Sequence, residues 1–307
     1  MTARSLKDLL ARNALHVVCV SVPCLVLLLA AGLYLRARPV LGLRSLGGLI
    51  FSSAWRPSGG EFGMGGFIAG SLLVTALAMF IAVPLGLLTA IYLAEYAPAR
   101  IKETYRPVVD VLAGISPVIY GVWGVLVVVP FVRGFVMPFA ARFLPFFPFV
   151  SDNYTGYSAL AAGIVLAIMV LPVLISVGVE VMEAVPLELR EASLALSATR
   201  WQTVRRVVLR RARTGIIAAV ILSLSRAFGE TFAVLMVAGC SLRGVPRSVF
   251  DPAYPLPALI ANTYGEMMSV ELYDSAVMAA ALVLFAVAFA FNALAWGVLL
   301  RVQRRWA

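Results

Sequence analysis

Two charged residues stand inside an apolar stretch, and their types suit the binding of an anion. Arg226 lies near the middle of residues 214–238, and Glu230 follows four positions later. On a continuous helix this spacing places both side chains on one face. A guanidinium attracts an oxyanion and can bind it through two hydrogen bonds. A carboxylate accepts a hydrogen bond only from an oxyanion that carries a proton.

If this stretch crosses a bilayer, both charges require an explanation. A charge at the bilayer centre costs at least about 2.5–3.5 kcal/mol, so we expect Arg226 and Glu230 to line a substrate path. The alternative is structural, with the two side chains neutralising each other and locking the helices together. Tyr120 follows LAGISP, whose glycine and proline allow the chain to bend. Its hydroxyl can face the same path, or the ring can serve packing at the membrane interface.

The chain lacks the residue patterns of common catalytic and metal sites. Neither of its two lysines, Lys7 and Lys102, follows a glycine as a phosphate-binding loop requires. The single histidine, His16, and the three cysteines form no metal-binding spacing. No serine lies in a G-x-S-x-G turn. We therefore expect a transport subunit that is not an enzyme and that binds no metal and no cofactor itself.

Composition indicates an all-α membrane protein. Of the 307 residues, 62% are hydrophobic and 13% are charged, whereas a soluble domain is about 25% charged. The net charge of +10 is explained by basic inner loops, so we expect no nucleic-acid partner. Six apolar segments are long enough to cross a bilayer: residues 15–35 (with Pro23, expected to kink it), 67–92, 107–132, 157–181, 214–238 and 276–300.

The distribution of basic residues predicts the orientation in the membrane. Arginine and lysine are more frequent in residues 1–14, 95–106, 182–213 and 301–305 than in the remaining segments outside the spans, residues 36–66, 133–156 and 239–275. Both termini are therefore predicted to be cytoplasmic, in a multi-pass protein of the plasma membrane. Residues 1–14 form either a short helix on the lipid surface or a basic flank. The aromatic, proline-broken segment FLPFFPF is expected in an external loop at headgroup level.

Two domains are expected: residues 1–66, with the first span and an external loop, and a transmembrane core at 67–307. Within the core, we expect a long cytoplasmic loop at about 182–213 that contains two short helices. Pro186 can open the first, over residues 187–196, and Thr199 with Gln202 forms a capping box that starts the second. Apolar Leu194, Leu196 and Trp201 suit insertion into a groove on another protein. The alternative is an interfacial loop held by arginines at lipid headgroups.

This loop resembles the EAA loop of ABC importer permeases, which docks on a cytoplasmic ATPase subunit. The family pattern is E-A-A, three residues, glycine, nine residues, then I-x-L-P. The spacing is kept here, while serine replaces the glycine and arginine replaces the proline. The matching positions are Glu191, Ala192 and Ser193, then Ser197, then Val207, Leu209 and Arg210. The resemblance implies the type I permease fold and assigns Thr199 and Trp201, in the same loop, to ATPase coupling.

Five further stretches resemble the C-type permease family of phosphate ABC importers (PstC). They are AWRPSGGEFG, TALAMFIAVPLGLLTAIYLAEYAP, LAGISPVIYGVWG, SRAFGETFAVLMVAG and SVFDPAYPLPALIA, in the family's order. The resemblance implies a second permease of A type, an ATPase dimer that binds ATP and Mg²⁺, and an external phosphate-binding protein. The pattern R-A-x-G-E supports a substrate role for Arg226 and Glu230. The alternatives are another oxyanion (phosphonate, molybdate or sulfate) or a self-sufficient secondary transporter, for which internal repeats are expected.

Overall fold

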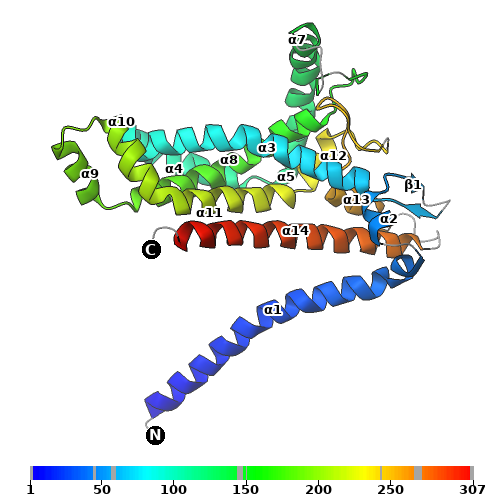
Figure 1. The fold of residues 1–307 in the computed structure, drawn as a ribbon, viewed down its shortest axis with the longest axis horizontal. Helices are drawn as coiled ribbons and strands as arrows, with labels where there is room; N and C mark the ends of the chain where they lie inside the picture. The colour runs from blue at the N-terminus through cyan, green and yellow to red at the C-terminus, as the bar shows by residue number, and fades with distance from the viewer. Residues whose placement is uncertain are drawn as a thin grey trace.

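The structure is a bundle of helices (Figure 1). The computed structural model describes residues 3–43, 46–56, 60–143, 148–149, 151–242, 244–265 and 272–304. Within these, five helices are long and apolar enough to cross a membrane: Arg12–Gly42, Gly65–Tyr96, Pro117–Phe143, Ala159–Glu183 and Tyr273–Leu294. This finding confirms an all-α membrane protein, but the predicted set of six continuous spans needs correction at two places.

The first, second, fourth and sixth predicted spans are helices. They are α1 (Ala3–Leu43), α3 (Gly65–Ile91), α8 (Ala159–Glu183) and α14 (Tyr273–Arg304). Residues 3–14 continue into α1, so they form neither a separate surface helix nor a frayed flank. The N-terminal half of α1 leaves the bundle (Figure 1), and its side chains are exposed from Arg12 to Leu29.

Helices α3 and α8 form the centre of the bundle because small residues let them approach closely. A Cβ added at Gly86 of α3 meets the side chain of Leu174 at 2.6 Å, and one at Gly163 of α8 meets Leu77 at 2.8 Å. Membrane helices commonly associate through such small residues. Helix α11 (Leu209–Phe228) packs against α8, α3 and α14 and completes this core.

The third predicted span, residues 107–132, is wrong because the chain bends in its middle. Helix α4 (Ala99–Gly114) ends before Ile115 and Ser116, and α5 (Pro117–Trp123) then begins. Pro117 forces the preceding residue out of the helical region, and Ser116 has ψ 137°. The helix then continues to Phe143 through η3 (Gly124–Val128), α6 (Val129–Phe131), η4 (Val132–Val136) and α7 (Met137–Phe143).

This second half of the bent segment leaves the bundle at a steep angle (Figure 1). Arg133, expected at the start of an external loop, therefore lies in helix η4. Most of FLPFFPF (residues 143–149) lies outside the described residues.

The fifth predicted span, residues 214–238, is also divided. Helix α11 ends at Phe228, and the short α12 (Phe232–Val237) begins after Gly229, Glu230 and Thr231. Gly229 and Thr231 have φ, ψ values of −84°, −3° and −111°, −59°, which do not continue the helix. The charged Glu230 is thus placed in a break of the backbone and not on the face of a continuous helix.

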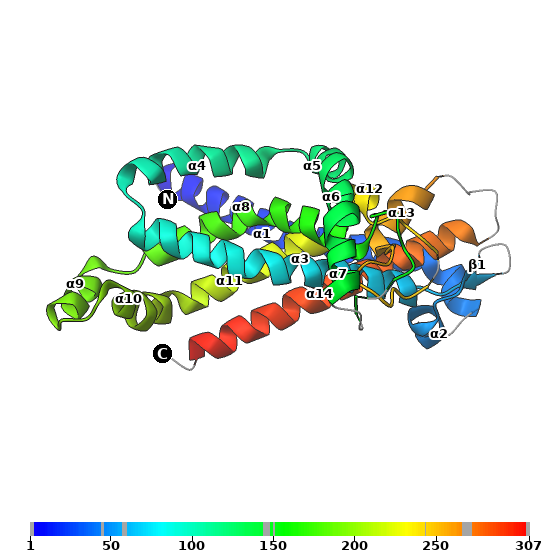
Figure 2. The ribbon, with the colours of Figure 1, turned by 90° about the horizontal axis from the view of Figure 1, so that it is seen from above.

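The two ends of the bundle differ in character (Figures 1 and 2). One end, here called the hairpin end, carries the antiparallel pair of strands β1 (Trp55–Arg56) and β2 (Glu61–Phe62), with α2 (Leu46–Phe51) and α13 (Leu256–Thr263). Trp55 packs edge-on against Phe62, Phe67 and Tyr273 there. Burial raises the pKa of the nearby Cys240 to about 11.

The opposite end carries the handle, which comprises α9 (Leu187–Ala195), the following turn and α10 (Arg200–Thr203). From α10 the helix continues without interruption through η5 (Val204–Val208) into α11. Both chain ends lie at the handle end of the molecule (Figure 1). The predicted pair of short helices is therefore present, with a direct helical connection into the core.

Candidate functional site

The two breaks in the helices lie next to each other, and they bring Tyr120 and Arg226 together. The Tyr120 hydroxyl donates a hydrogen bond to the carbonyl of Leu112 at 2.9 Å. The guanidinium of Arg226 donates to the carbonyl of Ala113 at 3.5 Å. Carbonyls at the end of a helix have no partner within it, so side chains from α5 and α11 satisfy the end of α4.

Arg226 retains most of its capacity to bind an anion. Its bond to Ala113 is at the outer limit of hydrogen-bond length, and its side chain is exposed. Among the described residues no ion pair joins Arg226 to Glu230. The expected juxtaposition of the two charges on one helix face is therefore wrong, because the helix ends between them.

Glu230 is held by the start of the next helix. Its Oε1 accepts hydrogen bonds from the backbone N–H groups of Phe232 at 3.1 Å and Ala233 at 3.3 Å. The residue also lines a cavity of about 10 Å³ with Ser71 and Thr75 of α3, a space for one water molecule at most. Glu230 thus caps α12 and faces α3, while Arg226 faces the end of α4.

Three further polar residues near this junction were missed by sequence reasoning. Ser225 donates a hydrogen bond to Oδ1 of Asn292 on α14 at 2.7 Å. Within the described chain, the hydroxyl of Ser223 is buried and has no hydrogen-bond partner. The asparagine within the apolar sequence FAFNALAW was the available signal, since polar groups inside a membrane are expensive and usually functional.

The handle has the turn geometry that its sequence predicts. Thr199 accepts a hydrogen bond from the Gln202 backbone, and Gln202 accepts one from the Thr199 backbone, which confirms the capping box. Ser197 has φ 60°, so it adopts the left-handed conformation that glycine takes most easily. Ser193 is hydrogen-bonded to Thr203 at 2.9 Å, which joins α9 to α10.

The outer surface of the handle exposes apolar side chains that water does not favour. Leu196 is 85% exposed and Trp201 50% exposed, and Leu194 is also exposed. Glu191 and Ala192 lie exposed on the neighbouring surface of α9. An apolar group rimmed by charges at one end of a molecule is typical of a protein interaction site.

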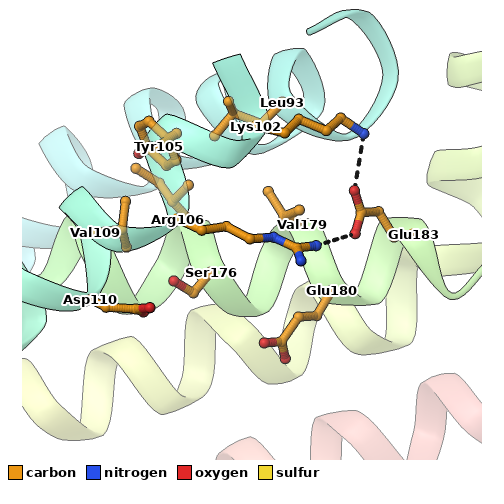
Figure 3. A pocket seen from close by; sticks show the side chains of 11 residues that line it. Leu93, Lys102, Tyr105, Arg106, Val109, Asp110, Ser176, Val179, Glu180 and Glu183 are labelled. Atoms are coloured by element: carbon orange, nitrogen blue, oxygen red, sulfur yellow. Dashed lines mark hydrogen bonds and ion pairs between the residues drawn. The ribbon is translucent and has the colours of Figure 1, made fainter. Parts of the chain in front are cut away.

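Sequence reasoning did not predict a set of charged contacts below the handle, here called the collar. It is formed by Glu95 of η2 (Tyr92–Tyr96), Lys102 and Arg106 of α4, Glu183 of α8 and Arg190 of α9. Glu183 binds Lys102 at 3.0 Å and Arg106 at 2.9 Å (Figure 3). In the sequence, the only indication of these contacts was the group of basic residues in the predicted inner loops at 95–106 and 182–213.

A cavity of about 330 Å³ lies between α4 and α8 beside these contacts (Figure 3). Asp110 and Glu180 line it in addition to collar residues. Burial raises the pKa of Tyr105, which also lines this cavity, above its ordinary value. In the part of the chain that the structure describes, no three His, Cys, Asp or Glu side chains gather as metal ligands.

Comparisons with known proteins agree on one family. The family described as binding-protein-dependent transport system inner membrane component matches residues 82–304. The chain is 36% identical over 258 residues to the phosphate transport system permease protein PstC of Mesorhizobium japonicum, covering 83% of this chain and 78% of that relative. It is 38% identical over 239 residues to the probable ABC transporter permease protein YqgH of Bacillus subtilis, covering 77% and 72%.

A solved structure confirms the predicted permease fold. A chain of the MetNI methionine ABC transporter, in an inward-facing conformation, matches with a TM-score of 0.57 at 20% identity. The match covers 76% of this chain and 93% of that chain. With the apolar helices, the exposed handle and these relatives, the chain belongs to the family of binding-protein-dependent transport system inner membrane components.

Proposed function

We propose that this chain is the C-type permease subunit of an ATP-driven importer for inorganic phosphate. The observation that carries the proposal is the identity of 35–38% with several curated permeases, most of which are named for phosphate transport. The chain forms half of the translocation path, and a second permease of A type forms the other half. An ATPase dimer and an external phosphate-binding protein complete the importer.

Arg226, Tyr120 and Glu230 line the path in this proposal. Arg226 supplies a positive charge at the junction of the two helix breaks, where it attracts the oxyanion. Tyr120, which shares the end of α4 with Arg226, offers a hydroxyl beside it. The hydrogen bonds from Phe232 and Ala233 both reach Oε1 of Glu230, so Oε2 can accept one from a protonated phosphate. Sulfate carries no such proton and is repelled.

The handle docks on the ATPase, which holds the ATP and Mg²⁺. Leu194, Leu196 and Trp201 enter an apolar groove, and Glu191 lies at its rim. Ala192 and Ser193 complete the EAA-like segment, while Ser197 and Thr199 shape the turn. Movement of the docked handle reaches Arg226 through the continuous helix from α10 to α11. This arrangement puts the handle end, and with it both chain termini, in the cytoplasm.

Reconstituted transport tests the substrate and the energy source together. Proteoliposomes containing both permeases, the ATPase and the binding protein should take up labelled phosphate only with ATP and Mg²⁺. An excess of unlabelled phosphate should compete, whereas sulfate, molybdate and a phosphonate should not. Uptake without the ATPase would indicate a secondary transporter, and stronger competition by another oxyanion would reassign the substrate.

A further inference from the structure

Glu95 receives contacts from both helices of the handle, through its carboxylate from α9 and through its backbone carbonyl from α10. Its side chain is 9% exposed, and Oε1 lies 3.0 Å from the guanidinium of Arg190, whose side chain is 17% exposed. The Glu95 backbone carbonyl accepts a hydrogen bond from Arg200 of α10. The Arg200 guanidinium also lies 4.9 Å from the ring of Tyr96. The end of α3 is therefore the point on which α9 and α10 converge.

Arg190 connects three elements through one planar group. Besides Glu95, it donates hydrogen bonds to the carbonyl of Met182 at 2.7 Å and to that of Val185 at 2.9 Å. These carbonyls lie at the end of α8 and in the turn that follows it. Arginine stays charged at any physiological pH. Its charge, largely withdrawn from solvent here, therefore depends on Glu95 for compensation.

Apolar packing does not attach α9 to the core. Helix α9 has no buried residue, and Leu187, Leu189 and Leu194 are all exposed. Its side-chain contact through Ser193 leads only to α10. A displacement of α9 can therefore reach α3 and α8 through Arg190, whereas α11 receives it through the continuous helix. The two routes together make the three central helices move as a unit.

We propose that Arg190 and Glu95 form a strut that transmits movement of the handle to α3 and α8 during transport. Both are positioning residues that contact neither substrate nor ATP. This inference rests on the proposed docking of the handle on an ATPase. Without the strut, the ATPase still binds the handle and hydrolyses ATP, but only α11 follows the handle directly. Hydrolysis then proceeds with little opening of the path around Arg226.

Neutral variants test the strut by separating transport from hydrolysis. In the complete importer, Arg190→Gln and Glu95→Gln should each lower phosphate transported per ATP by about tenfold, the usual size of a coupling between two sites. Co-purification of the ATPase and its hydrolysis rate should stay at the unmodified level. Arg205→Gln is the matched control, because Arg205 is exposed and forms no ion pair among the described residues. An unchanged transport ratio in both variants would overturn the proposal.

A cross-link between positions 95 and 190 provides a second test. It remains informative even if the neutral variants fold poorly. Cys19, Cys24 and Cys240 are first replaced by serine, and Glu95→Cys with Arg190→Cys is then introduced. Before cross-linking, this importer should hydrolyse ATP with little transport. A short bis-maleimide linker between the two thiols should restore transport, because a strut moves as a rigid connection. Failure of the linked importer to recover, or loss of ATPase binding in all of these variants, would refute the strut.

The controls also separate this inference from the proposed function. If the unmodified importer takes up no phosphate but its ATPase is stimulated by another loaded binding protein, the substrate assignment fails. The strut variants are then tested with that binding protein, by measuring how much of its substrate is transported per ATP hydrolysed. If phosphate uptake is normal and the strut variants match it, only the strut fails.

Discussion

The guanidinium of Arg226 makes a long hydrogen bond to Ala113, and its side chain remains exposed. A bond of 3.5 Å contributes little energy, so the folded chain does not depend strongly on this residue. Because Glu230 bonds instead to the backbone of α12, the loss of one charge does not leave the other without its partner. The two residues can therefore be tested separately, which an ion pair would not allow.

Arg226→Gln should abolish most transport while leaving stability unchanged. Hydrogen bonds from a charged group are worth about 1.5–3 kcal/mol, so phosphate uptake should fall by roughly 10- to 100-fold. Uptake is measured at matched membrane abundance, with thermal unfolding as the stability readout. Arg36→Gln, at an exposed arginine of α1 outside the handle, is the control. Near-normal uptake by Arg226→Gln combined with Glu230→Gln would exclude both residues from transport.

Glu230 has two separable effects, on the start of α12 and on the choice of anion. Glu230→Ala removes the cap and should cost about 1 kcal/mol in the free energy of unfolding. Glu230→Gln keeps an oxygen that can cap and should remain stable, but it loses the negative charge. We expect that variant to discriminate less between phosphate and sulfate, measured by competition for uptake. Equal discrimination by Glu230→Gln and the unmodified chain would contradict the role in selectivity.

At the scale of the elements, the handle is built around Ser197. A serine in the left-handed region costs roughly 1–2 kcal/mol, and the capping box at Thr199 fixes the residues that follow. The turn therefore keeps the geometry expected for the glycine of the EAA pattern, despite the replacement. Because of this turn geometry, Leu196 and Trp201 are exposed at the end of the molecule.

Changes on the exposed surface of the handle should uncouple the importer. Trp201→Ala removes an aromatic anchor of the kind that dominates protein interfaces, and Glu191→Lys reverses a charge at its rim. Each should lower co-purification of the ATPase by about tenfold or more, since an anchor is commonly worth 2 kcal/mol. Trp296→Ala is the control, because Trp296 is also exposed, at 66%, but lies on α14. Unchanged co-purification and uptake for both handle variants would contradict docking there.

At the scale of the whole molecule, the handle and the hairpin end lie at opposite ends of the bundle (Figure 1). In the proposed importer, this separation lets one end face the binding protein while the other faces the ATPase. The path in the proposed function passes the two helix breaks, where α4, α5, α11 and α12 meet. Backbone that leaves the helical form at membrane depth is tolerated only within protein or beside water, which fits a translocation path at this junction.

The predicted orientation can be checked by labelling thiols from outside the cell. In a chain without its native cysteines, Tyr154→Cys near the hairpin end should react with a membrane-impermeant maleimide on intact cells. Leu196→Cys on the handle should react only after the membrane is permeabilised. Both side chains are well exposed, at 78% and 85%, so access and not burial decides the result. The reverse pattern would place the handle and both termini outside.

The membrane class, four of the spans, the two helices of the handle and the capping box were all predictable from the sequence. These features depend on local composition and on contacts between residues a few positions apart, such as Thr199 with Gln202. The two breaks at Ser116 and Gly229 were partly signalled by proline and glycine, but hydropathy averages over a break of two or three residues. The apolar pattern of residues 214–238 therefore predicted one helix where there are two.

Which charges meet depends on the packing of helices that are distant in the chain. The spacing of four residues predicted that Arg226 and Glu230 lie side by side on one helix. Because α11 ends between them, Arg226 contacts α4 and Glu230 contacts α12. Conversely, Glu95 and Arg190 are far apart in sequence and form a nearly buried ion pair. The reason is physical: a buried charge binds whatever partner the packing brings within about 4 Å. That partner is set by how the start of α9 packs against the ends of α3 and α8, which no local pattern encodes.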